Sequence, residues 1–223
     1  MNKYKLKIKL LSDTTFGRGD GVAGIVDQEV EHDSYGLPYL RGRTLKGLLS
    51  EECDNLIDTL IDNQGDWRNL ACKLFGVSGS GLDIMAAVHI GDARLPTDLQ
   101  RAVAHAIQDK NNNLTSQQVL SSLTSIRKQT AISAETGVAE AKSLRSARVV
   151  IRDLEFVSDL LFETEPVAEE MLTLLAVGTL ALRHLGSGRN RGRGHVQCTL
   201  YDADGNHITQ NHTHRFGQEV KKS

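Results

Sequence analysis

Residues 186–196 read GSGRNRGRGHV and join an apolar stretch to a stretch that alternates between polar and apolar residues. Glycine lets the backbone approach a ligand closely, and arginine donates charge-assisted hydrogen bonds to phosphate oxygens. The segment is no P-loop, because it lacks the Gly-Lys-Ser/Thr ending, and no Rossmann fingerprint, because it follows a helix. It predicts a loop that binds the backbone of RNA or DNA, with a plain glycine-rich turn as the alternative. The predicted contacts are Gly186, Gly188, Arg189, Arg191, Gly192, Arg193 and Gly194.

The segments on either side of this loop predict a helix and two strands. Pro166 suits a first helical position, and the apolar run that follows predicts a helix through Leu185 that Gly186 ends. Residues 195–202 predict the closing strand, and residues 153–163 predict a strand before the helix. The C-terminal half therefore predicts a strand–helix–strand unit.

The N-terminal half repeats this arrangement. Residues 3–10 alternate strictly between lysine and a Tyr, Leu or Ile residue, which is the pattern of a half-buried strand. The lysines predict a solvated sheet face, with a phosphate-binding face as the less frequent alternative. Thr44 is the predicted N-cap of a helix whose apolar stripe runs to Ile61, and residues 88–93 predict a short strand.

The element order is thus strand, helix, strand, insertion, strand, helix, strand. This order predicts an α+β chain with a ferredoxin-like (RRM-like) sheet and a large insertion in its middle. We expect residues 1–223 to form one domain. Its predicted parts are the sheet with its helices (about 1–94 and 153–202), a helical insertion (about 97–128), a β-hairpin (about 129–151) and a polar tail that frays (206–223).

Composition excludes several classes of protein. The 223 residues carry 26 Lys and Arg against 28 Asp and Glu, so the net charge of −2 attracts no nucleic acid and any polyanion site must be a local cluster. The three cysteines, at positions 53, 72 and 198, form neither a disulfide framework nor a zinc motif, which favours a cytoplasmic protein. The alternating N-terminus is unlike a signal peptide, and the apolar run 171–185 is too short to span a bilayer.

A second basic segment, PYLRGRTLKG, occupies residues 38–47. Its cations fall where a helix begins, and a helix N-terminus attracts anions through free N–H groups and a partial positive charge. Alone this pattern is weak, but it gains weight beside the arginines of 186–194. The predicted RNA contacts are Arg41, Arg43, Thr44 and Lys46. We expect both segments to converge on one groove that binds a polynucleotide.

Together these residues resemble the RAMP superfamily of CRISPR-associated RNA-binding proteins. The N-terminal match is carried by Asp33, Gly36, Pro38, Gly42, Thr44, Leu45, Lys46 and Gly47, and the C-terminal match by Gly186, Gly188, Gly192 and Gly194. The segments LFG (74–76), HIGDARL (89–95) and residues 136–156 resemble the middle of the same superfamily. The similarity spans nearly the whole chain and is strongest to the backbone subunit of type III effector complexes.

The resemblance implies a right-hand shape with palm, fingers and thumb. Such subunits associate into a filament along the guide RNA (crRNA), with complementary target RNA and other effector subunits as further partners, and no membrane is involved. The predicted hairpin of residues 129–151, with Thr136 and Gly137, would be the thumb, which displaces one nucleotide at regular intervals.

The resemblance also implies a catalytic residue. Residues 26–33, VDQEVEHD, are similar to the family pattern Ile-Asp-x-x-Val-x-x-Asp and put Asp27 at the cutting position, with Asp33 and His32 as alternates. In members that cut, this aspartate cleaves target RNA with a divalent metal, so Mg²⁺ or Mn²⁺ is the implied cofactor and Asp27 the implied ligand. A carboxylate can deprotonate the 2′-hydroxyl of RNA or hold a hydrated metal ion.

Three alternatives remain open at this point. In the first, the chain is a scaffold that does not cut, and Asp27 only shapes its loop. In the second, the chain processes the precursor guide with His32. In the third, it is an unrelated RRM-type binder, which the lack of paired aromatic residues on any strand disfavours. Two departures from the family pattern leave the subfamily open. Arg41 replaces a small residue or proline before Gly42, and ISAETG (132–137) replaces an Asp-Arg pair before Thr-Gly.

Overall fold

The computed structural model describes residues 4–60, 64–77, 85–109, 111–163 and 167–222. Its centre is an antiparallel sheet in the order β2-β5-β1-β6. The strands are β1 (Tyr4–Leu10), β2 (Val88–Ile90), β5 (Glu155–Phe162) and β6 (Val196–Tyr201). Ile8 of β1 lies opposite Phe156 of β5 and Cys198 of β6. The prediction of a chain that mixes helices with antiparallel strands is confirmed.

One face of this sheet forms the core, and β1 shows why. Successive side chains of a strand point to opposite faces, so alternating residue types separate an apolar face from a charged one. The buried side chains of β1 are Leu6, Ile8 and Leu10, and the exposed ones are Lys5, Lys7 and Lys9. The alternation in the sequence thus determines which face of β1 the helices cover.

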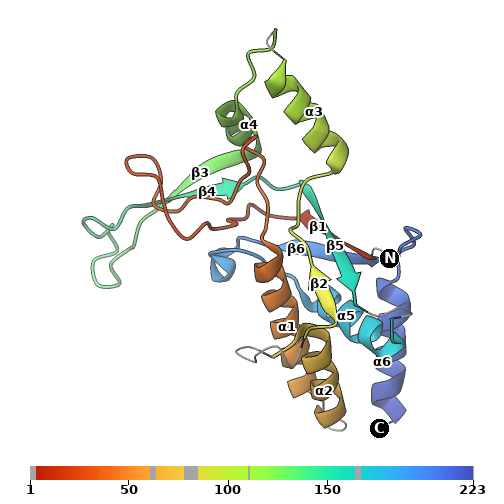
Figure 1. The fold of residues 1–223 in the computed structure, drawn as a ribbon. Helices are drawn as coiled ribbons and strands as arrows, with labels where there is room; N and C mark the ends of the chain where they lie inside the picture. Colours follow the sequence, from red (N-terminus) through yellow and green to blue (C-terminus); the bar gives the residue numbers. More distant parts are fainter. Residues whose placement is uncertain (1–3, 61–63, 78–84, 110, 164–166, 223) are drawn as a thin grey trace.

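The helices on the apolar face are α1 (Gly42–Asp58), α2 (Gln64–Phe75), α5 (Glu169–Ala181) and α6 (Thr209–Lys222) (Figure 1). α5 is apolar nearly all round because it packs against α1, α2, α6 and β6. Its Gly178 is the point of close approach, since an added Cβ would lie only 2.4 Å from Sγ of Cys53 in α1. None of the helices in the described ranges is long and apolar enough to span a membrane.

Two further units project away from these helices (Figure 1). One is a pair of helices, α3 (Thr97–Gln108) and α4 (Ser116–Leu123), at the top of the view. The other is a hairpin of β3 (Thr124–Gln129) and β4 (Arg145–Val150), which extends to the left. The chain passes directly from α4 into β3, and the Thr124 hydroxyl donates a hydrogen bond to the Leu120 carbonyl (2.6 Å).

The boundary between insertion and hairpin differs from the prediction. We predicted helix to about residue 128, but α4 ends at Leu123 and β3 occupies the next residues. The cause is strand pairing, because Thr124 lies opposite Val150 and Gln129 lies opposite Arg145 in a regular antiparallel ladder. Pairing with a partner strand overrides the helical character of a polar segment, and that partner is distant in sequence.

The start of α1 also differs. Thr44 is no N-cap, since the helix begins at Gly42 and the cap position is Arg41, whose side chain makes no capping hydrogen bond. The N–H of Gly42 donates instead to Oδ1 of Asp92 (3.0 Å), a residue that follows β2. A carboxylate from a distant segment therefore satisfies the first free N–H of the helix.

The end of α5 lies earlier than predicted. The helix stops at Ala181, and the residues up to Leu185 are extended, with the Leu185 N–H donating to the Gly194 carbonyl (2.8 Å). This contact closes the glycine-rich loop at its base and competes with further helix. Pro166, the predicted first helical residue, lies outside the described residues.

The C-terminal segment forms α6, contrary to the prediction that it frays. Its Phe216 ring meets the Trp67 ring of α2 edge-on, with centroids 5.1 Å apart. At its start, the Thr209 hydroxyl accepts a hydrogen bond from the Leu200 N–H of β6 (2.7 Å). Helices in proteins owe most of their stability to tertiary packing, so the polar sequence alone did not indicate this one.

A buried ion pair joins the hairpin to the loop that follows β1. Oε1 of Glu29 lies 2.7 Å from Nε of Arg148 on β4, and the two side chains are only 3% and 8% exposed. Glu29 also accepts the Val30 N–H (2.9 Å), and Arg148 donates to the Thr124 hydroxyl (3.3 Å). The Arg148 N–H donates to the Gln28 carbonyl (2.9 Å). We call this arrangement the Glu29–Arg148 clamp.

Replacing Arg148 with Met should lower the free energy of unfolding by about 3–5 kcal/mol, because it leaves the Glu29 carboxylate buried without its partner. Urea denaturation followed by circular dichroism measures the loss. The matched control is Arg145→Met on the same strand, where the side chain is exposed and the change should stay within about 0.5 kcal/mol. Equal stability of the two variants would contradict the role of the clamp.

Candidate nucleic-acid interface

The glycines of the 186–194 loop are required by the backbone. An added Cβ at Gly186 would lie 2.3 Å from the Thr15 carbonyl oxygen, and one at Gly194 would lie 2.0 Å from that of Leu185. Both residues also have a positive φ of 75°, which glycine adopts at little cost. Between them, Gly188 and Gly192 flank a single 3₁₀ turn, η1 (Arg189–Arg191). The loop is therefore a folded bend with a defined course.

This bend lines a cavity of about 580 Å³ that we call the central hollow. Three segments distant in sequence surround it: the loop after β1, the ends of β3 and β4 that lie toward the hairpin tip, and the glycine-rich loop. The lining residues with charged or polar side chains are Asp27, Gln28, Gln129, Arg145, Ser146, Ser187, Arg189, Arg191 and Arg193. All three arginines predicted from the loop thus line the same cavity as Asp27.

Hydrogen bonds hold these three segments together. Nε2 of Gln28 donates to the Ser187 hydroxyl (2.8 Å), which ties the loop after β1 to the glycine-rich loop. The Ser187 N–H donates to the Thr15 carbonyl (3.0 Å). The Glu29–Arg148 clamp ties the same loop to β4. The position of Asp27 relative to the arginines is consequently fixed by contacts on both sides.

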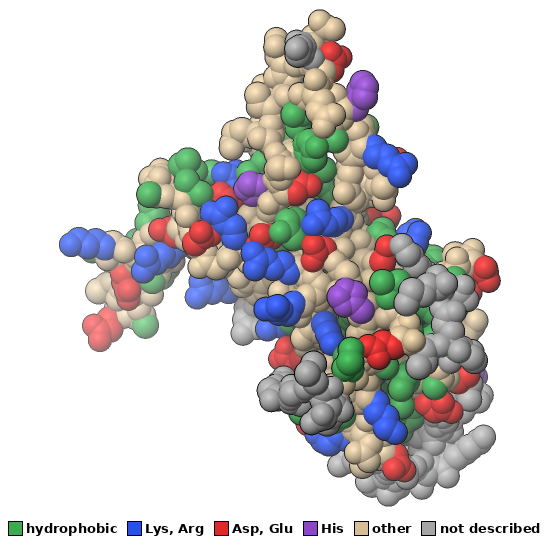
Figure 2. Space-filling view, viewed as in Figure 1, with side chains coloured by type: hydrophobic (Ala, Val, Ile, Leu, Met, Phe, Trp, Pro, Cys, Tyr) green, Lys and Arg blue, Asp and Glu red, His purple; other side chains and the backbone are tan. Residues whose placement is uncertain are grey.

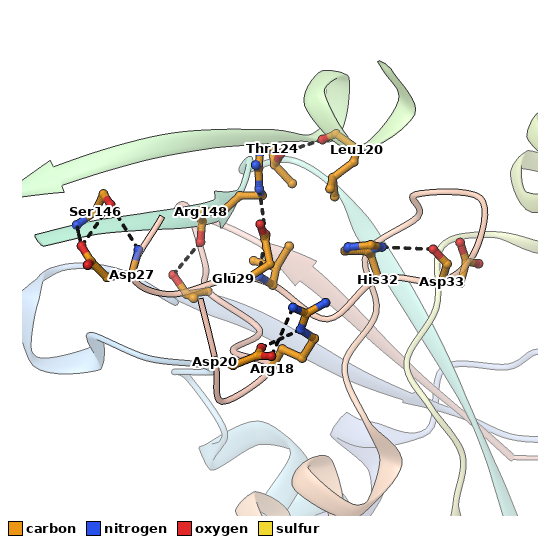
Figure 3. A network of polar contacts seen from close by, with 12 residues as sticks. Arg18, Asp20, Asp27, Glu29, His32, Asp33, Leu120, Thr124, Ser146 and Arg148 are labelled. Atoms are coloured by element: carbon orange, nitrogen blue, oxygen red, sulfur yellow. Dashed lines mark hydrogen bonds and ion pairs between the residues drawn. The ribbon is translucent and has the colours of Figure 1, made fainter. Parts of the chain in front are cut away.

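Asp27 is exposed and hydrogen-bonded to the hairpin (Figure 3). Its Oδ2 accepts the N–H of Ser146 (2.6 Å) and the hydroxyl of Ser146 (3.0 Å). The backbone and side-chain hydrogen bonds from Ser146, in that order, hold the pKa of Asp27 below its usual range. Both bonds fall on Oδ2, so Oδ1 takes no part in the hydrogen bonds from Ser146. Asp27 is therefore an oriented carboxylate at neutral pH.

The two alternates to Asp27 lie elsewhere. In Figure 3, His32 and Asp33 lie at the opposite end of the network from Asp27. Oδ1 of Asp33 accepts the N–H groups of Tyr35 (2.9 Å) and Leu37 (3.0 Å), and Nδ1 of His32 lies 3.1 Å from the Asp33 carbonyl oxygen. Neither residue lines the central hollow. Their polar atoms shape the turn that leads to α1.

The basic start of α1 divides between two hollows. Arg41 and Thr44 line a cavity of about 360 Å³, the helix-mouth hollow, together with Gly186, Ser187 and Arg189. Arg189 and Ser187 line the central hollow too, so the two cavities adjoin. Within this cavity, the Arg41 guanidinium lies 2.7 Å from a carboxylate oxygen of Glu31.

The other two predicted contacts of this segment point elsewhere. Arg43 and Lys46 line a separate hollow beside Phe75 and Val77, and partial burial lowers the pKa of Lys46. The expected convergence of the helix start and the glycine-rich loop therefore holds for Arg41 and Thr44 but not for Arg43 and Lys46. Thr136 and Gly137 lie at the exposed tip of the hairpin and line none of these hollows.

Basic side chains collect in the middle of the molecule. Figure 2 shows Lys and Arg side chains gathered where the loops between the hairpin and the helices meet, with acidic side chains among them. The charge of the whole chain is −2, so this concentration is local. Such an arrangement attracts a polyanion to one region without making the protein basic.

Sequence reasoning missed the hairpin residues of the site. Ser146 orients Asp27, Arg145 and Gln129 line the central hollow, and Arg148 forms the clamp. Gln129 ends β3 and the other three lie on β4, whose sequence RSARVV carries no motif that indicates a site. They reach the site because β4 runs beside the loop after β1, where the Asp27 N–H donates to the Ser146 carbonyl (3.0 Å).

The central hollow offers little to a metal ion by itself. Asp27 is the one carboxylate among its described lining residues, and the described chain holds no cluster of three or more His, Cys, Asp or Glu side chains suited to a metal. Mg²⁺ often binds through one or two carboxylates together with phosphates of the substrate and water. Asp27 is the lining residue that could hold Mg²⁺ or Mn²⁺ in that manner, and a substrate phosphate would have to complete the site.

A family model describes this combination of fold and glycine-rich loop. The model of the RAMP superfamily matches residues 7–197, a range that contains β1, the Asp27 loop, the hairpin and the glycine-rich loop. The chain therefore belongs to the RAMP superfamily.

Solved structures share the fold. The type III-B Cmr-beta complex bound to cognate target RNA contains a chain with a TM-score of 0.61 and 14% identity, matched over 91% of this chain and 97% of that one. A chain of type III-B Cmr-beta in the apo state gives a TM-score of 0.60 and 14% identity, over 89% and 96%. No curated protein matches the sequence. At this identity the likeness shows a shared fold.

Replacing Ser146 with Ala should raise the pKa of Asp27 toward its usual range, because the hydroxyl donor is lost. The rise should be partial, since the stronger backbone N–H donor remains. Because the folded-state pKa is lowered, these bonds stabilise the loop above the usual carboxyl pKa, and the stabilisation is lost as pH falls through the lowered value. NMR titration of the Asp27 carboxyl measures the shift. An unchanged midpoint would show that the hydroxyl has no such role.

Proposed function

We propose that this protein is a guide-RNA-binding backbone subunit of a type III CRISPR effector complex, and that it cleaves complementary target RNA at Asp27. The observation that carries the proposal is the central hollow, where Asp27 and the three loop arginines line one cavity. Its partners would be crRNA, target RNA, further copies of itself in a filament, and other effector subunits. The structural relative bound to target RNA supports this choice of partners. The three free cysteines agree with a cytoplasmic location.

We interpret the two sheets as palm and thumb. The order β2-β5-β1-β6, with α1 between β1 and β2 and α5 between β5 and β6, supports the interpretation as a ferredoxin-like palm. The β3–β4 hairpin projects from it with an exposed tip, as a thumb that displaces a nucleotide would. Large apolar side chains are exposed toward this tip and suit contact with a nucleobase. They are Ile132, Val138 and Leu144.

The guide would bind through its phosphates. Arg189 and Arg191 are exposed on η1, Arg193 is half-buried, and all three line the central hollow. Arginine presents a planar set of donors that matches phosphate oxygens in two-point contacts. The adjoining helix-mouth hollow adds Arg41, so the cations continue past one end of the cavity.

Cleavage would use the 2′-hydroxyl of the target as an internal nucleophile. Its oxygen would form a bond to the neighbouring phosphorus as the bond from that phosphorus to the 5′-oxygen breaks, and the departing 5′-oxygen would take a proton from water. Asp27 is an oriented carboxylate, and its Oδ1 is the atom suited to take the proton from that hydroxyl. A divalent metal bound with the scissile phosphate would neutralise the charge that develops there. The arginines would hold the neighbouring phosphates so that nucleophile and leaving group lie in line.

A scaffold without cutting is the second candidate function. It is favoured by the two Ser146 hydrogen bonds, which give Asp27 a structural role in joining its loop to the hairpin. Processing of a precursor guide by His32 has less support, because that ring lies outside the central hollow and faces the carbonyl of Asp33.

Replacing Asp27 with Ala should abolish target cutting while guide binding survives. The loss of the carboxylate should slow cleavage by at least about 10²-fold, the lower end of what general acid–base catalysis contributes. The assay follows labelled target RNA in the complex assembled with guide and Mg²⁺. Asp20→Ala is the matched control, because this exposed carboxylate of the same loop lies outside the central hollow. If Asp27→Ala cuts the target as fast as the wild type, cleavage at Asp27 is contradicted and the scaffold function remains.

Replacing Arg189, Arg191 and Arg193 together with Gln should weaken RNA binding and reduce its salt dependence. Each phosphate contact on a single strand adds about 0.7 to the slope of log K against log salt, so the slope should fall by about 2. Fluorescence anisotropy with labelled RNA over a salt series measures it. The control replaces Lys5, Lys7 and Lys9 with Gln, an equal loss of charge on the open sheet face. Equal slopes for both variants would contradict binding in the central hollow.

A further inference from the structure

A third cavity lies beside the glycine-rich loop and shares two lining residues, Gln129 and Arg193, with the central hollow. It has a volume of about 350 Å³, and we call it the outer hollow. Its charged and polar lining includes Arg127 and Lys128 of β3, Arg152 of the turn between β4 and β5, Arg193 of the loop, Asp13 and Gln129. Sequence reasoning predicted only Arg193 among these side chains as a ligand contact.

Asp13 organises this cavity. Its Oδ2 accepts two hydrogen bonds from the Arg127 guanidinium (2.6 and 3.1 Å), and its Oδ1 accepts the Arg152 N–H (3.3 Å). Its carbonyl accepts the Gly194 N–H (3.0 Å). One residue therefore joins β3, the β4–β5 turn and the glycine-rich loop, and it orients Arg127.

The charge of the outer hollow is strongly positive. Four cations line it, and Asp13 is the one acidic residue among the described lining. The side chains of Lys128 and Arg152 are exposed, and neither forms an ion pair with a described residue of the chain. Arginine and lysine gathered from three segments around a small polar cavity are suited to a phosphate group.

The outer hollow continues the central hollow. Gln129 and Arg193 line both cavities, so the two meet at these side chains. Arg189 in turn lines both the central and the helix-mouth hollow. Arginines thus follow an unbroken path from the start of α1, past Asp27, to β3. The path matches a ligand whose phosphates repeat along its length. An acidic protein surface does not provide such regularly spaced phosphates.

We propose that the outer hollow binds a phosphodiester group of the same polynucleotide that occupies the central hollow. The strand then passes the tip-proximal half of the β3–β4 ladder, with phosphates held at β4 on one side and at β3 on the other. Arg127, which Asp13 orients, and Arg193 of the glycine-rich loop would contact the phosphodiester group. Lys128 and Arg152 supply two further exposed cations. This inference rests on the proposed binding of RNA in the central hollow.

The test replaces Lys128 and Arg152 with Gln, because both side chains are exposed and the fold should be retained. Binding of oligouridylates of increasing length is measured with the full chain by fluorescence anisotropy over a salt series. For long RNA, the affinity should fall about tenfold at physiological salt, and the slope of log K against log salt should fall by about 1.4. For RNA too short to span both hollows, the variant should equal the wild type. Lys5→Gln with Lys9→Gln is the matched control and should bind all lengths as the wild type does.

The outcomes separate the two proposals. If Lys128→Gln/Arg152→Gln binds long RNA with the wild-type affinity and slope, the proposed binding in the outer hollow is overturned. Weaker binding by the Arg189/Arg191/Arg193 variant in the same assay would still support binding in the central hollow. An equal loss at every RNA length would also overturn it, because the two hollows would then not be separate subsites. If the wild-type chain binds no RNA of any length, the proposed function and this inference fail together.

Discussion

The buried ion pair of Glu29 and Arg148 is the constraint on which the arrangement of the site depends. Two charges removed from water remain stable only when their geometry and their further hydrogen bonds compensate for desolvation. Here the compensation includes the Val30 N–H and the Thr124 hydroxyl. Because these partners come from the loop after β1, from β3 and from β4, the pair is satisfied only when all three have assembled. The loop after β1, which also contains several glycines, thereby acquires one defined position.

Parts of the fold could be predicted because their causes are local. The alternation of Lys and apolar residues in β1 follows from strand geometry, and the glycines of 186–194 follow from close backbone contacts. The parts that could not be predicted have distant causes. β3 is a strand because 145–150 lies beside it, and α6 is a helix because Phe216 meets Trp67. Neither cause can be recognised within a window of neighbouring residues.

The residues of the site also fall into two groups, those that local sequence indicates and those that only the tertiary fold brings together. Arginines at alternate positions in a glycine-rich loop predict phosphate binding from local sequence, and Arg189, Arg191 and Arg193 do line one cavity. Arg127 and Arg152 join them only through Asp13, which accepts hydrogen bonds from both segments. The helix start shows the converse case, because Arg43 and Lys46 share its sequence pattern but line another cavity. Residue type indicated the chemistry, whereas the tertiary fold decided which residues meet.

The hydrogen bonds between Asp27 and Ser146 have a mechanical consequence. Ser146 and Arg148 are two positions apart on β4, and both are bonded to the 27–29 segment. The hairpin and this segment are therefore joined at two points, so the Asp27 carboxylate keeps its place relative to the strand that carries the projecting tip.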